Sequence, residues 1–271
     1  MRGIVEMQLW QFALIYLLLL IVLMIMKKCH INQSKLLIIA SVRMTVQLIL
    51  AGLILTYIFE NPHPLFVLLY LTIMITFAIH RVLSQNKGIN YRFKLAIGMS
   101  LAVSGLCIVA FFICIVIGES IFNPQYIVPI SGMIMGNAMT GASLGVKTFR
   151  ESFNGQTSKI TALLNIGVTP QKILLPFVNQ AIETALLPTL NSMLGMGIVA
   201  LPGMMTGQIL SGTLPTTAIL YQIAIMIAVC SVVCLSVFGS LYLGYKTLYN
   251  TQNQIDFAAL NKSQLHLLTK K

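Results

Sequence analysis

Residues 147–176 read KTFRESFNGQTSKITALLNIGVTPQKILLP, the one long polar stretch in a chain that is otherwise mostly apolar. On both sides of it, long apolar runs alternate with short polar gaps. Hydrophobic residues make up 57% of the 271 residues and charged residues 8%, against about 25% charged in an ordinary globular domain. A soluble fold would need more charge to cover its surface. The sequence therefore predicts an all-α, polytopic membrane protein.

Seven apolar runs are candidates to cross a bilayer, because about 20 helical residues span its hydrocarbon core. We expect membrane spans at about 7–26, 36–59, 65–79, 95–117, 127–146, 178–201 and 216–245. Together they form a single transmembrane domain over residues 1–271, with a cytoplasmic arm at 147–177. The third run is short. The segment from Pro202 to Pro215 is either an outer loop or a stretch that dips back into the membrane.

Lysine and arginine are confined almost entirely to alternate gaps. The gaps after the first, third and fifth spans and the C-terminal tail together hold fifteen of them, whereas the opposite gaps hold only Arg2. Basic loops stay in the cytoplasm. We therefore predict a multi-pass protein of the cell membrane, with its N-terminus outside and its C-terminus inside. The net charge of +11 is spread over these gaps rather than gathered in one patch, so nucleic acid is not an expected partner.

Two motif-like stretches do not indicate an enzyme. Gly141-Ala-Ser143-Leu-Gly145 matches the G-x-S-x-G pattern of serine hydrolases, but no histidine or aspartate lies well inside a span to activate the serine. Gly136 and Gly141 have the spacing of a P-loop but are not followed by its lysine. The five cysteines show no CxxC or other tight metal-binding spacing. Cys230 and Cys234 share a helix face, which allows a thiolate metal site, but small buried apolar side chains explain the cysteines best. We expect no catalytic residue and no cofactor in this chain.

Polar residues inside spans are costly in lipid and mark functional sites. The sixth span is both polar and interrupted by proline, as expected of a helix that lines a cavity. Arg43 and Glu183 each lie roughly 8 to 10 Å inside the cytoplasmic end of their spans, so we expect them to pair, either structurally or as part of transport. Our candidates for the transport pathway are Arg43, Gln47, Asn137, Glu183, Asn191, Met204 and Met205.

Methionine and glycine patterns leave two alternatives each. Methionines gather at 133–139, 193–196 and 204–205. Thioethers bind soft metals such as Cu(I), but a methionine in an apolar helix is more often a packing residue, so the metal ligands stay unidentified. The GxxxG pairs Gly132/Gly136, Gly141/Gly145 and Gly203/Gly207 allow close helix packing. They indicate either a tight bundle or a dimer interface.

The polar stretch itself predicts a rigid knob. Gly167 is a good residue to end a helix, and Thr169 can cap the next helix with Pro170 at its first position. Pro176 should then limit that second short helix before the chain re-enters the membrane near Val178. The first helix should bury one apolar face, formed by Phe149, Phe153, Ile160, Leu163 and Leu164. A helix, a tight turn and a second helix would suit docking into a partner's cleft.

Several motifs carry a family resemblance. Residues 166–176, IGVTPQKILLP, are similar to the end of the coupling-helix motif of ABC importer permeases. A match over nearly the whole chain comes from SVRMTVQL (41–48), PISGMIMGNAM (129–139), GVTP (167–170) and LPGMMTG (201–207). With these motifs the chain resembles the FetB-type (YbbM-like) permeases of ABC transporters, which include bacterial iron-export permeases and plant aluminium-tolerance membrane subunits.

The resemblance implies a membrane subunit that works with a separately encoded P-loop ATPase, as two permeases with two ATPases. ATP and Mg would be bound by the ATPase, and the cargo would be exported, with iron or another metal as candidate. The residues expected to couple to the ATPase are Gly167, Val168, Thr169, Pro170, Lys172 and Ile173. The alternative is a secondary transporter of a metal or small solute, driven by an ion gradient. That class would favour ionisable residues near the membrane centre and would not need the knob.

Overall fold

The computed structural model describes residues 8–250, 252 and 254–257. Within them the chain is a set of helices: α1 (Leu9–Lys28), α2 (Ser34–Glu60), α3 (Pro64–Gln85), α4 (Tyr91–Phe111) continued by a π-helical segment (Phe112–Ile117), α5 (Pro124–Gly155), α6 (Thr157–Asn165), α7 (Pro170–Gly195), α8 (Gly203–Leu210), α9 (Pro215–Tyr245) and a short 3-10 turn (Lys246–Leu248). Seven of these described helices are long and apolar enough to cross a membrane. The predicted all-α class and number of spans are confirmed.

Helix α7 differs from the prediction, because Pro176 does not end a short helix. Instead α7 runs unbroken from Pro170 through Pro176 and Pro188 to Gly195. A proline inside a helix costs about 3 kcal/mol or more. Around Pro176 the side chains of Ile173, Leu174, Phe177 and Val178 are all buried against the neighbouring helices, and such packing lets a membrane helix tolerate an internal proline. The packing of these four side chains therefore outweighs the loss of the helix hydrogen bond at Pro176. The fifth span likewise continues past the predicted Val146 to Gly155, and the third is 22 residues long.

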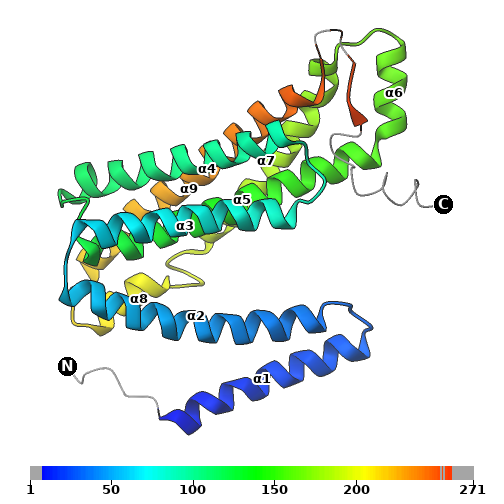
Figure 1. Cartoon of the computed structure of the whole chain (residues 1–271). Helices are drawn as coiled ribbons and strands as arrows, with labels where there is room; N and C mark the ends of the chain where they lie inside the picture. Colours follow the sequence, from blue (N-terminus) through cyan, green and yellow to red (C-terminus); the bar gives the residue numbers. More distant parts are fainter. Residues whose placement is uncertain (1–7, 251, 253, 258–271) are drawn as a thin grey trace.

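The core of the molecule is a bundle in which α9 packs against α4, α5 and α7, with α3 covering α5 (Figure 1). Two glycines explain how closely α5 approaches its neighbours. A Cβ added at Gly141 would meet Val233 at 2.6 Å, and one added at Gly145 would meet Val237 at 2.9 Å. By contrast, a Cβ at Gly136 would meet nothing within 4 Å. The pair Gly141/Gly145 therefore serves close helix packing inside the bundle.

We expect Gly145→Ala to destabilise the bundle by about 1–3 kcal/mol, the usual cost of overpacking a filled site. Besides Val237, the added methyl would lie 3.3 Å from the Cβ of Ala185 on α7, so two neighbouring helices would have to shift. Thermal unfolding of the detergent-solubilised chain measures the effect. Gly136→Ala on the same helix is the matched control and should leave the melting temperature at or above that of the wild type. Equal melting temperatures for both variants would contradict this packing.

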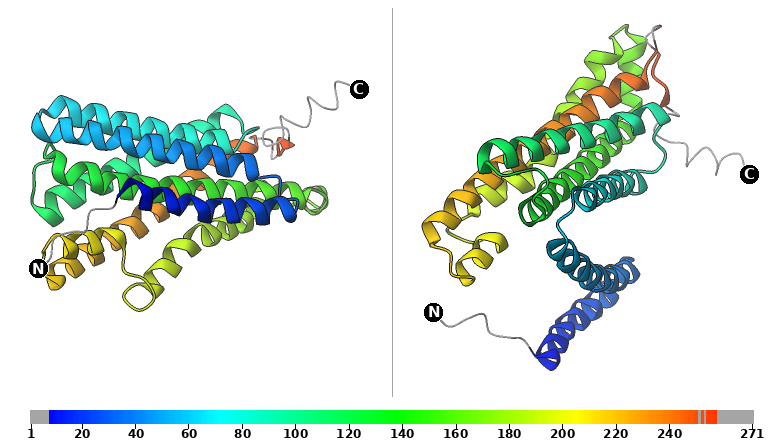
Figure 2. Two further views of the ribbon diagram at one scale, coloured as in Figure 1. Left: turned by 90° about the horizontal axis from the view of Figure 1, so that it is seen from below. Right: turned by 60° about the vertical axis from the view of Figure 1, so that its left-hand side comes forward.

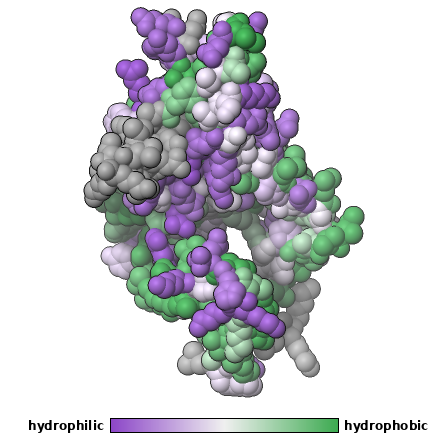
Figure 3. Space-filling model, turned by 90° about the vertical axis from the view of Figure 1, so that its right-hand side faces the viewer, coloured by the Kyte–Doolittle hydropathy of each residue, from purple (hydrophilic) through white to green (hydrophobic). Residues whose placement is uncertain are grey.

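Helices α1 and α2 form a hairpin that stands apart from the bundle (Figures 1 and 2). Their apolar windows are 0% and 6% buried. The two helices are joined by a hydrogen bond of 2.5 Å between the hydroxyls of Tyr16 and Thr45. Figure 3 looks onto the end of the molecule that carries α6, here called the α6 end, and shows a hollow between this hairpin and the bundle.

The α6 end also gathers the turns that carry the basic residues. The turn between α1 and α2, the turn between α3 and α4 and the C-terminal end of α9 all lie there (Figure 1). These are the gaps that the distribution of lysine and arginine assigned to the cytoplasm. The orientation across the membrane stays a prediction. The segment between Pro202 and Pro215 forms the short helix α8, packed on α9.

Candidate functional site

The knob at the α6 end (residues 149–169) is built on buried aromatic residues. Phe149, Phe153 and Ile160 are at most 1% exposed, and Leu163 and Leu164 pack against the same core, as the predicted apolar face requires. One feature differs, since this face is shared by two helices rather than one. The backbone breaks at Gln156 (φ −118°, ψ 24°), the residue that separates α5 from α6. Gln156 is the polar residue that interrupts the apolar pattern.

The turn after α6 has the geometry of a Schellman motif. Gly167 adopts φ +86°, its N–H donates to the carbonyl of Leu164 at 2.9 Å, and the N–H of Val168 donates to the carbonyl of Leu163 at 3.1 Å. The predicted helix end at Gly167 is confirmed. Thr169 and Pro170 occupy the predicted cap and first position of α7, but the Thr169 side chain makes no capping hydrogen bond. The backbone alone fixes this turn.

The six predicted coupling residues divide into supports and exposed positions. Pro170 and Ile173 are buried under the turn and Val168 is half-buried. The exposed members are Gly167, Thr169 and Lys172. Sequence reasoning missed the most prominent apolar side chain, Ile166, which is 75% exposed at the tip. Ile166 is not part of the apolar face of α6, and this could have indicated that its side chain is exposed.

The chain's C-terminal segment folds back against this turn. Tyr249 and Ile255 form an antiparallel bridge, Ile255 is buried, and the ring of Phe257 lies 5.7 Å from that of Phe153. A cavity of about 450 Å³ lies between the turn at 167–169 and Gln252, Gln254 and Ile255. The knob is thus held from two sides, by α5 and by the C-terminal segment.

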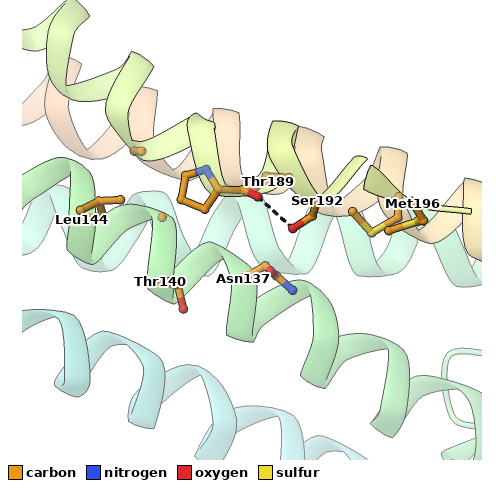
Figure 4. A pocket seen from close by; sticks show the side chains of 10 residues that line it. Asn137, Thr140, Leu144, Thr189, Ser192 and Met196 are labelled. Atoms are coloured by element: carbon orange, nitrogen blue, oxygen red, sulfur yellow. Dashed lines mark hydrogen bonds between the residues drawn. The ribbon is translucent and has the colours of Figure 1, made fainter. Parts of the chain in front are cut away.

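A second candidate site is a pocket of about 270 Å³ between α5, α7 and α9 (Figure 4). Its chemistry comes from Asn137, Thr140, Thr189, Ser192, Met196 and Met226. Three of these side chains donate a hydrogen bond to a carbonyl of their own helix: Asn137 to Met133 at 2.8 Å, Thr140 to Gly136 at 2.9 Å and Ser192 to Pro188 at 2.9 Å. None of the lining residues is ionisable.

A neighbouring pocket of about 280 Å³ shares Thr140 and Leu144 with the first and lies between α3 and α5. It is lined by Arg81, Gln85, Ser143 and Lys147 among others. The hydroxyl of Ser143, the serine of the G-x-S-x-G pattern, donates to the side-chain oxygen of Gln85. An amide oxygen is no base, so this arrangement does not activate a nucleophile. The exposed face of α5 therefore carries two polar pockets in succession.

The family follows from comparison with known proteins. The model of the uncharacterised protein family UPF0014 matches residues 9–249. The chain belongs to the UPF0014 family. Relatives include the UPF0014 membrane protein YjkA of Bacillus subtilis, 30% identical over 90% of this chain and 96% of that protein. The probable iron export permease protein FetB of Escherichia coli is 30% identical over 92% of this chain and 95% of its own length.

A plant relative, the protein ALUMINUM SENSITIVE 3 of Arabidopsis thaliana, is 30% identical over 79% of this chain and 77% of its own. No solved structure matches. Family membership and the seven apolar helices together identify a multi-pass membrane protein, and the resemblance drawn from the sequence motifs is confirmed. Within the residues described, no three histidine, cysteine, aspartate or glutamate side chains form a group that could hold a metal.

The predicted pathway residues of this UPF0014 chain are scattered. Asn137 lines the pocket, and Asn191 is the exposed neighbour of its Ser192. Met204 and Met205 are half-buried on α8, outside the pocket lining. Thr140, Ser192, Met196 and Met226 were not among the predicted pathway residues. Met226 lies on α9, and nothing in its own segment distinguishes it from other methionines.

The predicted pair of Arg43 and Glu183 is not formed within the chain. In the part that the structure describes, the one ion pair is Lys147–Glu151 at 3.9 Å, between side chains that are both about 60% exposed. The guanidinium of Arg43 instead lies over the ring of Phe77 on α3, 5.5 Å from its centroid. Gln47 and Glu183 are exposed on α2 and α7. The hairpin's separation from the bundle keeps the two charges apart.

Proposed function

We propose that this chain is the permease subunit of an ABC transporter, that its knob docks a separate P-loop ATPase, and that it exports iron or another metal. The observation that supports docking best is the knob itself. Its buried aromatic base and its backbone-fixed turn present an exposed isoleucine, Ile166, at the tip. An exposed apolar anchor on a rigid support is typical of a residue that fills a partner's pocket. The name of FetB supports the permease role and the metal cargo.

Helix α7 supplies the connection between knob and pocket. It begins directly after the turn and runs without a break past Ser192 of the pocket, a distance of about 33 Å along the helix. Because the helix is continuous, a displacement of the knob by the ATPase is transmitted to the pocket lining. Such rigid-body transmission between two packed states is a recurrent mechanism of switching proteins.

The permease is expected to act as a pair of copies, and two unpaired charges support this. Arg43 on α2 and Glu183 on α7 lie in candidate membrane spans, are exposed on the single chain and make no ion pair there. An isolated charge facing lipid is costly. In a two-fold dimer, a contact between one residue of the first copy and a different residue of the second copy occurs twice, once in each direction. We assign Arg43 of each copy to Glu183 of the second copy.

The direct test is co-purification of the tagged chain with candidate P-loop ATPases of its host, followed by measurement of ATP hydrolysis. We expect a stable complex whose hydrolysis rate responds to added metal. If the chain binds no ATPase of its host, the docking role is wrong and the gradient-driven secondary transporter takes its place. No residue in the pocket lining titrates near neutral pH, so no specific observation favours that alternative.

A further inference from the structure

The pocket between α5, α7 and α9 contains hydroxyl and amide oxygens that can act as acceptors. A hydroxyl has a single hydrogen, and those of Thr140 and Ser192 are already donated to their own helices. The Asn137 amide nitrogen donates one of its two hydrogens to its own helix, so this side chain keeps one hydrogen to donate and its Oδ1 to accept. Figure 4 shows Asn137 and Ser192 between α5 and α7, whereas Thr140 projects from α5 away from α7. A cluster of acceptors suits a ligand that is electron-poor.

Two thioethers complete the lining. Met196 follows the end of α7, and Met226 lies on α9. One turn before Met226, the buried side chain of Gln222 contacts the sulfur of Met196 through Nε2 at 3.8 Å. Its oxygen Oε1 is buried and, in the described structure, has no hydrogen-bond partner. A buried acceptor without a partner is destabilising.

The composition of the lining selects among cations. Hard divalent and trivalent ions prefer carboxylates, and the pocket has none. Thioether sulfur prefers soft ions such as Cu(I). The adjacent pocket carries Arg81 and Lys147, whose repulsion of a cation grows in proportion to the cation's charge. Both effects favour a soft ion of single charge.

We propose that this pocket binds a soft monovalent metal cation of the Cu(I) class, through the sulfur atoms of Met196 and Met226 and the oxygens of Asn137 and Ser192. The inference rests on the proposed export function and names the class of its cargo. It makes the methionines ligands rather than packing residues.

The test is isothermal titration of the purified chain with Ag(I), a redox-stable probe for soft monovalent ions. All five cysteines are free and, contrary to the prediction, none of them is buried in the single chain. Replacing them with alanine therefore removes competing thiols without breaking a disulfide. In this background Met196→Leu and Met226→Leu should each weaken Ag(I) binding at least tenfold. Exchange of Met for Leu nearly conserves volume, so folding is preserved. Met133→Leu, on α5 but outside the pocket lining, is the matched control and should bind as the parent does.

Unchanged Ag(I) affinity in both pocket variants, an equal loss in Met133→Leu, or tighter binding of Zn(II) than of Ag(I) would each overturn the proposal. X-ray absorption at the copper edge gives a second measurement, because a Cu(I)-loaded chain should show sulfur neighbours that Met196→Leu removes. Neither measurement involves the ATPase. A chain that binds Ag(I) at this pocket but forms no ATPase complex would therefore refute the proposed function and leave the metal site standing.

Discussion

Two charge-reversed chains, Arg43→Glu and Glu183→Arg, are each expected to lose dimerisation alone and to recover it when they are produced together. If Arg43 pairs with Glu183 of the second copy, each variant places like charges at both contacts of its own dimer. A like-charge contact costs several kcal/mol, so each variant alone should dimerise at least tenfold more weakly. A mixed dimer keeps one original pair and forms one pair of reversed polarity.

Sequential purification on two different tags isolates the mixed dimer and measures its amount. The design separates pairing between copies from pairing within one chain, because a pair within one chain stays broken in every mixed combination. Lys35→Glu, an exposed charge reversal at the start of the same helix, is the control and should leave dimerisation unchanged. Failure of the two reversed chains to rescue one another would show that these charges do not meet across the dimer.

The second large effect is expected at the tip of the knob. Ile166→Glu should weaken binding of the ATPase by about 30-fold or more, the loss typical of a central interface anchor of about 2 kcal/mol. The reason is that Ile166 is 75% exposed and would have to bring a carboxylate into an apolar contact. The affinity of the detergent-solubilised chain for the purified ATPase measures this effect.

The controls distinguish a docking defect from a folding defect. Ile166 contributes little to the chain's own packing, so the melting temperature of the variant should equal that of the wild type. Ser158→Glu introduces the same charge at an exposed position near the opposite end of α6 and should bind the ATPase normally. Equal weakening by both substitutions would indicate general charge repulsion and would remove Ile166 from the interface.

Local signals explain the parts of this fold that were predictable. Hydropathy over about 20 residues depends on no tertiary contact, so the seven spans could be read directly. The turn at Gly167 also follows from local chemistry, because glycine adopts positive φ without strain and proline is favoured at the first position of a helix. These two features place the knob.

The errors arise where tertiary packing decides. Pro176 looked like a helix end because its missing N–H is a local defect, whereas the burial of Phe177 and Val178 against the bundle is not visible in the sequence. Arg43 and Glu183 were paired by their similar depth, but the hairpin stands apart from the bundle. The pocket joins side chains from three helices, and Met226 could be assigned to it only once α9 was placed.

The close approach at Gly145 gives α7 a pivot. Near the middle of α7, an added Cβ at Gly145 would lie 3.3 Å from Ala185 and 3.6 Å from the carbonyl oxygen of Ala181. The knob lies at one end of the helix and Ser192 near the other, and from the contact at Ala185 the arm toward the knob is the longer one. A helix that turns as a rigid body about such a contact moves its two arms in opposite directions, and the longer arm moves further. An inward push on the knob would therefore swing the Ser192 wall of the pocket outward, without bending the helix.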